Sequence, residues 1–182
     1  MEINENQLSV LTENNRRSHE RVRFYIQEAL LLLMEEKDYD KIKITDIINK
    51  AGVSRSAFYR NYYWKKDILV DMCSRLAFEE DRIKATDDVM KNWEFIFEHI
   101  KKHERFYSLM EKNSLTGFLL DDMNKACSGL GENTFELILW NGMIYNTCRE
   151  WIRSGMKETP SEMTEFIKRQ LKRLGVKLSA IQ

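Results

Sequence analysis

The chain has 182 residues, in which 29 basic side chains balance 29 acidic ones, so its formal net charge is zero. No stretch approaches the roughly 20 uninterrupted apolar residues of a membrane span, and the polar start MEINENQLSV is not a signal peptide, so we expect a cytoplasmic protein. Because the sequence has one proline and seven glycines and its apolar residues recur at helical spacing, we predict an all-α fold of about nine helices.

The three cysteines indicate neither a disulfide framework nor a zinc site. Cys73, Cys127 and Cys148 are widely spaced, and no C-x-x-C pair occurs among them. We expect buried thiols that fill the core. The alternative is a redox sensor, which would need a thiol partly exposed near cations.

The first predicted helix covers residues 18–36 and has one apolar face. It should support the segment that follows, and acidic residues at its end lead into a turn. The apolar face consists of Val22, Ile26, Ala29, Leu30 and Leu33.

Residues 41–69 predict a helix-turn-helix, the motif with which many proteins read DNA. Ala51 closes a short apolar-periodic run, and Gly52 can adopt a positive φ where the chain reverses. Ser54 can then cap the second helix. Such a turn fixes the angle between the two helices.

The second helix of this segment has two different faces. Its packed side is predicted to comprise Val53, Phe58 and Tyr62, which can meet Ile44, Ile47, Ile48 and Ala51 of the first helix. On the opposite arc lie Arg55, Ser56, Tyr59 and Arg60, with Ala57 at its margin. These side chains can read base edges in the major groove, where arginine binds guanine with two hydrogen bonds.

Charge supports this interpretation because it is unevenly distributed. Between residues 41 and 66, seven lysines and arginines oppose one aspartate, which leaves a local net charge of +6 in a neutral chain. Local cations bind phosphates whether or not a distant surface is acidic. The alternative is a solvated helical hairpin whose charges only keep it soluble.

A wider pattern includes this turn and the residues after it. It consists of Ala51-Gly52-Val53-Ser54, Phe58-Tyr59, Tyr62, Lys65 and Asp67-Ile68-Leu69. In this pattern the segment resembles, without a gap, the tetracycline-repressor (TetR/AcrR) family of bacterial regulators. The resemblance implies that Thr45, Arg55, Ser56, Ala57 and Tyr59 face bases and that Tyr59, Asn61 and Lys65 hold phosphates.

Two positions depart from the family pattern. Lys43 stands where members commonly carry a capping threonine, which predicts a weaker cap. The second is Trp64, beside Tyr63, where small or polar residues are usual. Its bulk can rest on the sugar-phosphate surface or pack back on the preceding helix.

The remainder of the chain predicts a helical body. A helix from Lys65 to Lys84 would link the head to it, and the resemblance implies that such a body houses a small-molecule effector. Trp93, Phe97, Phe106, Met110 and Phe118 are the predicted lining of the effector cavity. Ordinary core packing is the alternative.

The last two predicted helices have surplus apolar surface. The first spans residues 133–154. A capping box at Thr159-Pro160-Ser161-Glu162 opens the second, which Gly175 ends. The resemblance implies that these helices pair with their copies across a two-fold axis and that the operator is a palindrome or near-palindrome.

The sequence contains few of the residue patterns that indicate an enzyme. His99 and His103 have a spacing that can chelate a metal, but no third ligand is evident, and a solvated polar face is the alternative. The pairs Asp87-Asp88 and Asp121-Asp122 are predicted at helix starts. We predict no catalytic residue, no metal and no cofactor.

These inferences predict a DNA-binding head over residues 16–66 and a ligand-sensing, dimerising body over residues 67–182. The predicted function is a transcriptional regulator, with repression as the expected sign. Three alternatives remain: an activator of the same fold that acts with a partner protein, a chromosome-organising DNA binder without a ligand, and a small enzyme.

Overall fold

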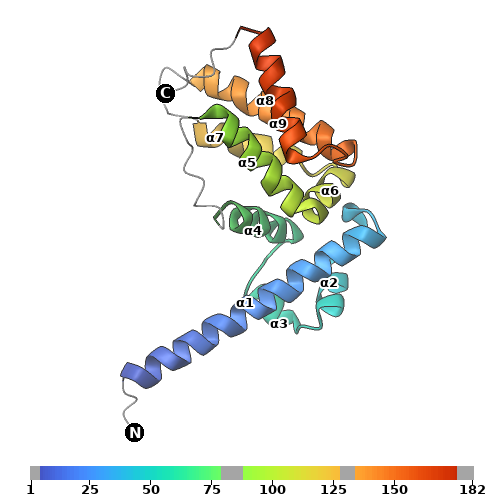
Figure 1. The fold of residues 1–182 in the computed structure, drawn as a ribbon. Helices are drawn as coiled ribbons and strands as arrows, with labels where there is room; N and C mark the ends of the chain where they lie inside the picture. The colour runs from blue at the N-terminus through green and yellow to red at the C-terminus, as the bar shows by residue number, and fades with distance from the viewer. Residues whose placement is uncertain (1–4, 79–87, 128–133, 176–182) are drawn as a thin grey trace. The chain divides into compact units, whose positions relative to one another are not determined.

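The computed structural model describes residues 5–78, 88–127 and 134–175 (Figure 1). Within these ranges every regular element is helical, with nine α-helices and one short 3-10 helix, as predicted for the fold class. The chain divides into two compact units, residues 1–80 and 81–182. The predicted functional ranges 16–66 and 67–182 stay predictions.

The first unit consists of four α-helices and the 3-10 helix. These are α1 (Glu5–Glu36), η1 (Tyr39–Lys41), α2 (Ile44–Ala51), α3 (Arg55–Tyr59) and α4 (Lys65–Phe78). The C-terminal half of α1 packs against α2, α3 and α4. The core side chains of this unit are fully buried and include Ile26, Leu30, Met34, Ile47, Phe58, Ile68 and Leu69.

Helix α1 begins well before the predicted residue 18. The prediction followed apolar periodicity, whereas residues 14–21 are exposed and polar. Ion pairs at helical spacing join this part of the helix instead: Glu13 binds Arg16 at 2.9 Å and Arg17 at 2.8 Å, and Arg16 binds Glu20 at 2.7 Å. Such pairs support a helix that no core contact holds.

A polar network joins α1, the end of the α3 turn and α4. Asp71 on α4 accepts hydrogen bonds from the Tyr62 hydroxyl at 2.6 Å and from the Gln27 amide at 2.7 Å. Arg23 on α1 pairs with the same carboxylate. Because Tyr62 and Gln27 are buried, each of these polar groups needs its partner inside the unit.

The second unit consists of α5 (Val89–Lys102), α6 (Glu104–Lys112), α7 (Gly117–Cys127), α8 (Thr134–Arg153) and α9 (Pro160–Arg173). Helix α5 packs along α9, and α8 packs on α6 and α7. The buried face of α5 follows helical spacing through Val89, Trp93, Phe97 and Ile100. It meets Trp151, Ile167 and Leu171 in one apolar core.

The predicted start of α9 is confirmed in detail. Thr159 Oγ1 accepts from the Glu162 backbone N–H at 3.2 Å, and the Glu162 carboxylate accepts from the Thr159 N–H at 2.7 Å. Pro160 occupies the first helical position, where its missing N–H costs nothing. Just past the helix end, Gly175 has φ of 73°.

Of the other predicted helix ends, some are confirmed, some are wrong and some lie outside the described residues. Helix α4 is described as far as Phe78, so the predicted end at Lys84 lies outside the described residues, as does Asp87. Asp88 does cap a helix, accepting from the N–H groups of Met90 and Lys91. Asp121 was placed wrongly, because α7 already begins at Gly117, and the side chain of Asp122 is outside the described set.

No helix in the described ranges is both long and apolar enough to cross a membrane.

Candidate nucleic-acid interface

The turn between α2 and α3 depends on Gly52. This residue has φ of 65° and ψ of 29°, the left-handed conformation that only glycine adopts without a steric cost. The Gly52 N–H donates to Asn49 O at 3.3 Å, and the Val53 N–H donates to Ile48 O at 3.3 Å. These two bonds form a Schellman motif, which ends α2 and turns the chain sharply into α3.

The start of α2 lacks a side-chain cap from Lys43, as predicted. Lysine has no acceptor, so only the reverse bond forms, from the Lys43 N–H to the Asp46 carboxylate at 3.1 Å. Lys37 binds the same carboxylate at 2.6 Å. The hydrogen bond from Lys37 lowers the pKa of Asp46. The single acidic group of residues 41–66 is therefore paired with a lysine from outside the segment.

The packed side of α3 agrees with the prediction. Phe58 and Tyr62 are buried, as are Ile47 and Ile48 of α2, whereas Val53, Ile44 and Ala51 are half-buried. Ser54 caps the helix by accepting from the Ala57 N–H at 3.1 Å. Burial of one face and capping of one end fix the direction of the opposite face.

That opposite face is exposed. Arg55, Ser56, Tyr59 and Arg60 are all solvent-exposed, Ala57 is half-buried, and Thr45 near the start of α2 is exposed. The Tyr59 ring lies edge-on against Phe58, with centroids 5.4 Å apart. Among the described residues, neither Arg55 nor Arg60 forms an ion pair. We call Thr45, Arg55, Ser56, Ala57, Tyr59 and Arg60 the reading face.

Two predicted phosphate ligands bond within the unit instead of pointing freely outward. The Lys65 ammonium donates to the carbonyls of Tyr39 at 2.6 Å and Ile42 at 3.1 Å, and it lies 4.1 Å from the Tyr39 ring centroid. The Asn61 amide donates to Ala57 O at 2.8 Å. Lys65 therefore ties the start of α4 to η1, and its predicted phosphate contact stays a prediction.

The aromatic pair after α3 points into solvent. Tyr63 and Trp64 are 73% and 71% exposed, so their rings do not pack back on the preceding helix. Their backbone N–H groups both donate to Asp67 Oδ2, at 3.0 Å and 2.7 Å. The loop that carries the rings is thus held by the first turn of α4.

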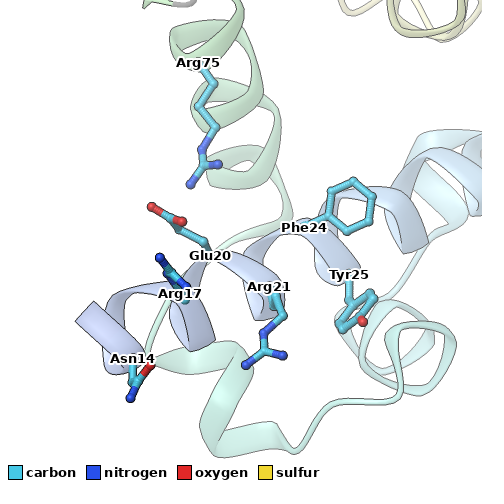
Figure 2. Close-up of a pocket in the computed structure, with 7 residues that line it drawn as sticks. All are labelled: Asn14, Arg17, Glu20, Arg21, Phe24, Tyr25 and Arg75. Atoms are coloured by element: carbon cyan, nitrogen blue, oxygen red, sulfur yellow. The ribbon is translucent and has the colours of Figure 1, made fainter. Parts of the chain in front are cut away.

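A shallow depression with a volume of about 760 Å³ lies elsewhere on the same unit, and sequence reasoning missed it. Figure 2 shows Arg75 of α4 pointing toward Glu20 and Arg17 of α1, whereas Arg21 and Tyr25 point to the other side. The signal was the arginine-rich run NNRRSHERVR, whose first four residues precede the predicted helix start at residue 18. The depression is lined by Asn14, Arg17, Glu20, Arg21, Phe24, Tyr25 and Arg75.

The residues predicted to line an effector cavity mostly fill the interior of the second unit. Trp93 stacks on Phe97 with centroids 5.5 Å apart, and Phe97 meets Trp151 edge-on at 5.2 Å. Phe106 and Met110 on α6 are buried, while Phe118 on α7 is half-buried. Core packing accounts for Trp93 and Phe97, and binding of an effector by these residues stays a prediction.

The histidine pair is neither a solvated face nor a metal cluster. His99 and His103 are half-buried with ring centroids 4.9 Å apart, and His99 Nε2 lies 2.7 Å from the Tyr107 hydroxyl. In the part of the chain that the structure describes, no three histidine, cysteine or acidic side chains gather as metal ligands would.

The cysteines differ in burial. Cys148 is buried as predicted, and burial raises the pKa of its thiol to about 12. Cys73 is half-buried, contrary to the expectation of a core thiol, because it lies beside the exposed face of α4. The side chain of Cys127 lies outside the described set.

Comparison with protein-family models and with curated proteins found no match for this chain.

Proposed function

We propose that this chain is a DNA-binding transcriptional regulator of the TetR/AcrR type, in which α2 and α3 form a helix-turn-helix. The supporting observation is the reading face: two arginines without an ion pair in the described chain, with a serine and a tyrosine, exposed on a helix whose other side is buried. Placed in a major groove, such a face offers donors to guanine and a methyl group to thymine.

The surrounding charge favours duplex DNA as the partner. The net charge of +6 over residues 41–66, two of whose lysines pair with Asp38 and Glu36 just outside the segment, favours phosphate binding through counterion release. Base contacts from Arg55 and the rest of the reading face would then select the sequence, while the cations around that face fix the position on the backbone.

We further propose that the protein acts as a homodimer through α8 and α9. Phe135 and Leu139, four residues apart on one face of α8, are 86% and 71% exposed, and Phe166 on α9 is 43% exposed. Unpartnered apolar surface of this kind indicates an interface. Two copies would present two reading faces to successive major grooves, which predicts a palindromic operator.

We also propose regulation by a small molecule, although Trp93 and Phe97 fill the interior of the predicted cavity with their own rings. An effector would act by favouring a conformation in which α4 swings and the spacing of the two heads changes. A chromosome-organising protein without a ligand is the second candidate function, and that filled interior favours it.

The test of the DNA-binding proposal is selection of duplexes from a randomised library, followed by affinity measurements by fluorescence anisotropy. We expect Arg55→Ala to lose about 1 to 3 kcal/mol of discrimination at one base position, because one bidentate contact disappears. Arg105→Ala is the matched control, since Arg105 is an exposed arginine on α6, outside the reading face and outside the proposed dimer helices. Equal selectivity of the Arg55→Ala and native proteins would refute the assignment of the reading face.

A further inference from the structure

The two most exposed aromatic side chains among the described residues of the first unit are neighbours. Tyr63 and Trp64 leave 73% and 71% of their surfaces in water, whereas the adjacent Tyr62 is 3% exposed. Large aromatic rings are usually buried inside the protein, because an exposed ring leaves a large apolar area in water. Two such rings side by side form a surface that lacks its partner.

The pair is also held in place before any partner arrives. Asp67 Oδ2 accepts both backbone N–H groups, and Lys65 fastens the next residue to the carbonyls of Tyr39 and Ile42. Little backbone entropy remains to be lost on binding, which makes even a modest contact effective.

The surroundings indicate an anionic partner. The pair lies inside the segment of net charge +6, with Arg60 before it and Lys66 after it, both exposed. A sugar-phosphate backbone combines an apolar sugar face with anionic oxygens. The indole N–H and the phenol O–H can donate to those oxygens while the rings cover the sugar.

We propose that Tyr63 and Trp64 form a neutral clamp on the deoxyribose-phosphate backbone beside the half-site. The inference rests on the proposed DNA binding and assigns the pair to the backbone, because the pair follows the C-cap of α3 and is not on the reading face. The clamp adds affinity for every sequence. It releases no counterion, since neither side chain carries a charge at neutral pH.

The test compares Trp64→Ala, Tyr63→Ala and Arg60→Ala in the full-length protein. The probes are a duplex that the native protein selects from a randomised library and a duplex of scrambled sequence. We expect each aromatic variant to bind both duplexes roughly tenfold more weakly, with an unchanged slope of log affinity against log salt. Arg60→Ala should instead reduce that slope by about 1.

Fluorescence provides a second readout. Of the four tryptophans, Trp93 and Trp151 are buried and Trp140 is half-buried, so acrylamide should quench Trp64 most strongly. Because acrylamide is uncharged, the electrostatic potential of DNA does not change its concentration near the protein. Without DNA, acrylamide should quench the native protein more than Trp64→Phe, and the difference is the contribution of Trp64. This difference should disappear when the selected duplex is added.

Phe24→Ala is the matched control, because Phe24 is 55% exposed on the same unit but lies outside the basic segment. Circular dichroism of all variants should match that of the native protein, since the substituted side chains are exposed. The clamp is refuted if the aromatic variants bind as tightly as the native protein and acrylamide still reaches the indole. A change in base preference, or a change in mass in solution without a change in affinity, would equally overturn it.

These outcomes are separate from failure of the proposed function. If the native protein binds neither duplex even at low salt, DNA binding itself is wrong. If the native protein binds DNA and the aromatic variants bind it with the same affinity, the clamp is wrong and the proposed function is unaffected.

Discussion

At the scale of single residues, the geometry of the candidate interface depends on one glycine. Gly52 takes a left-handed conformation, and its N–H group takes part in the hydrogen bonds that end α2. No heavy atom lies within 4 Å of the position where a Cβ would be added. A side chain at this position would therefore cause backbone strain without a clash.

We expect Gly52→Ala to lower the free energy of unfolding by about 1 kcal/mol, because a Cβ disfavours positive φ. Urea denaturation of the full chain measures this. Gly142→Ala is the control, with an expected effect of opposite sign. Gly142 is inside α8, its φ is not in the left-handed region, and no atom lies within 4 Å of an added Cβ. Alanine there should raise the free energy of unfolding by about 0.5 to 1 kcal/mol. If the two substitutions changed the free energy of unfolding equally, the positive φ of Gly52 would not be the cause of the loss in stability.

At the scale of elements, α1 combines a buried half and an exposed half within 32 residues. Its C-terminal half is fixed by core contacts, while ion pairs around Glu13 and Arg16 support the other half. Exposed pairs of this kind are weak singly and are screened by salt. The two halves should therefore respond differently to solution conditions.

We expect Glu13→Gln to lower the helicity of residues 12–20 in low salt, because Arg16 and Arg17 lose their common partner. Backbone chemical shifts measure this, and high salt should abolish the difference between variant and native protein. Hydrogen bonds from Arg16 and Arg17 lower the Glu13 pKa to about 2. The contribution of the native pairs should thus be present above the unfolded pKa and be lost only as the pH falls through about 2.

The elements that sequence predicted well are those defined by local chemistry. The capping box at Thr159 and the apolar spacing of α5 depend on residues within a few positions of one another, so their pattern is visible in the chain. The bonds of Lys65 to carbonyls more than 20 residues earlier depend on tertiary structure, and so does the outward direction of Trp64. The reading face was predictable because its buried neighbours have helical spacing.

At the scale of the whole molecule, the proposed dimer requires that the apolar surface of α8 be covered. Phe135 and Leu139 are more exposed than almost any other apolar side chain that the structure describes. Two copies could cover both residues at once, as isologous interfaces do.

We expect Leu139→Asp to shift the protein toward a monomer, because a buried carboxylate without a partner is costly at an interface. Sedimentation velocity measures the change in mass, and DNA affinity should fall with it. Lys102→Glu is the control, since Lys102 is exposed on α5 and gains an acid away from the apolar surface. A dimer that persists in Leu139→Asp would exclude α8 as the interface.

The Asp71 network has a consequence for the proposed regulation of DNA binding. Burial raises the Tyr62 pKa to about 12, so the phenol stays protonated and keeps donating to Asp71 at all physiological pH values. That bond, with those of Arg23 and Gln27, connects α1 and α4 to the segment that follows α3, so a tilt of α3 would have to break the bond or move α1 and α4 as well. If the chain binds DNA as proposed, a regulatory change should therefore move α1, α3 and α4 together.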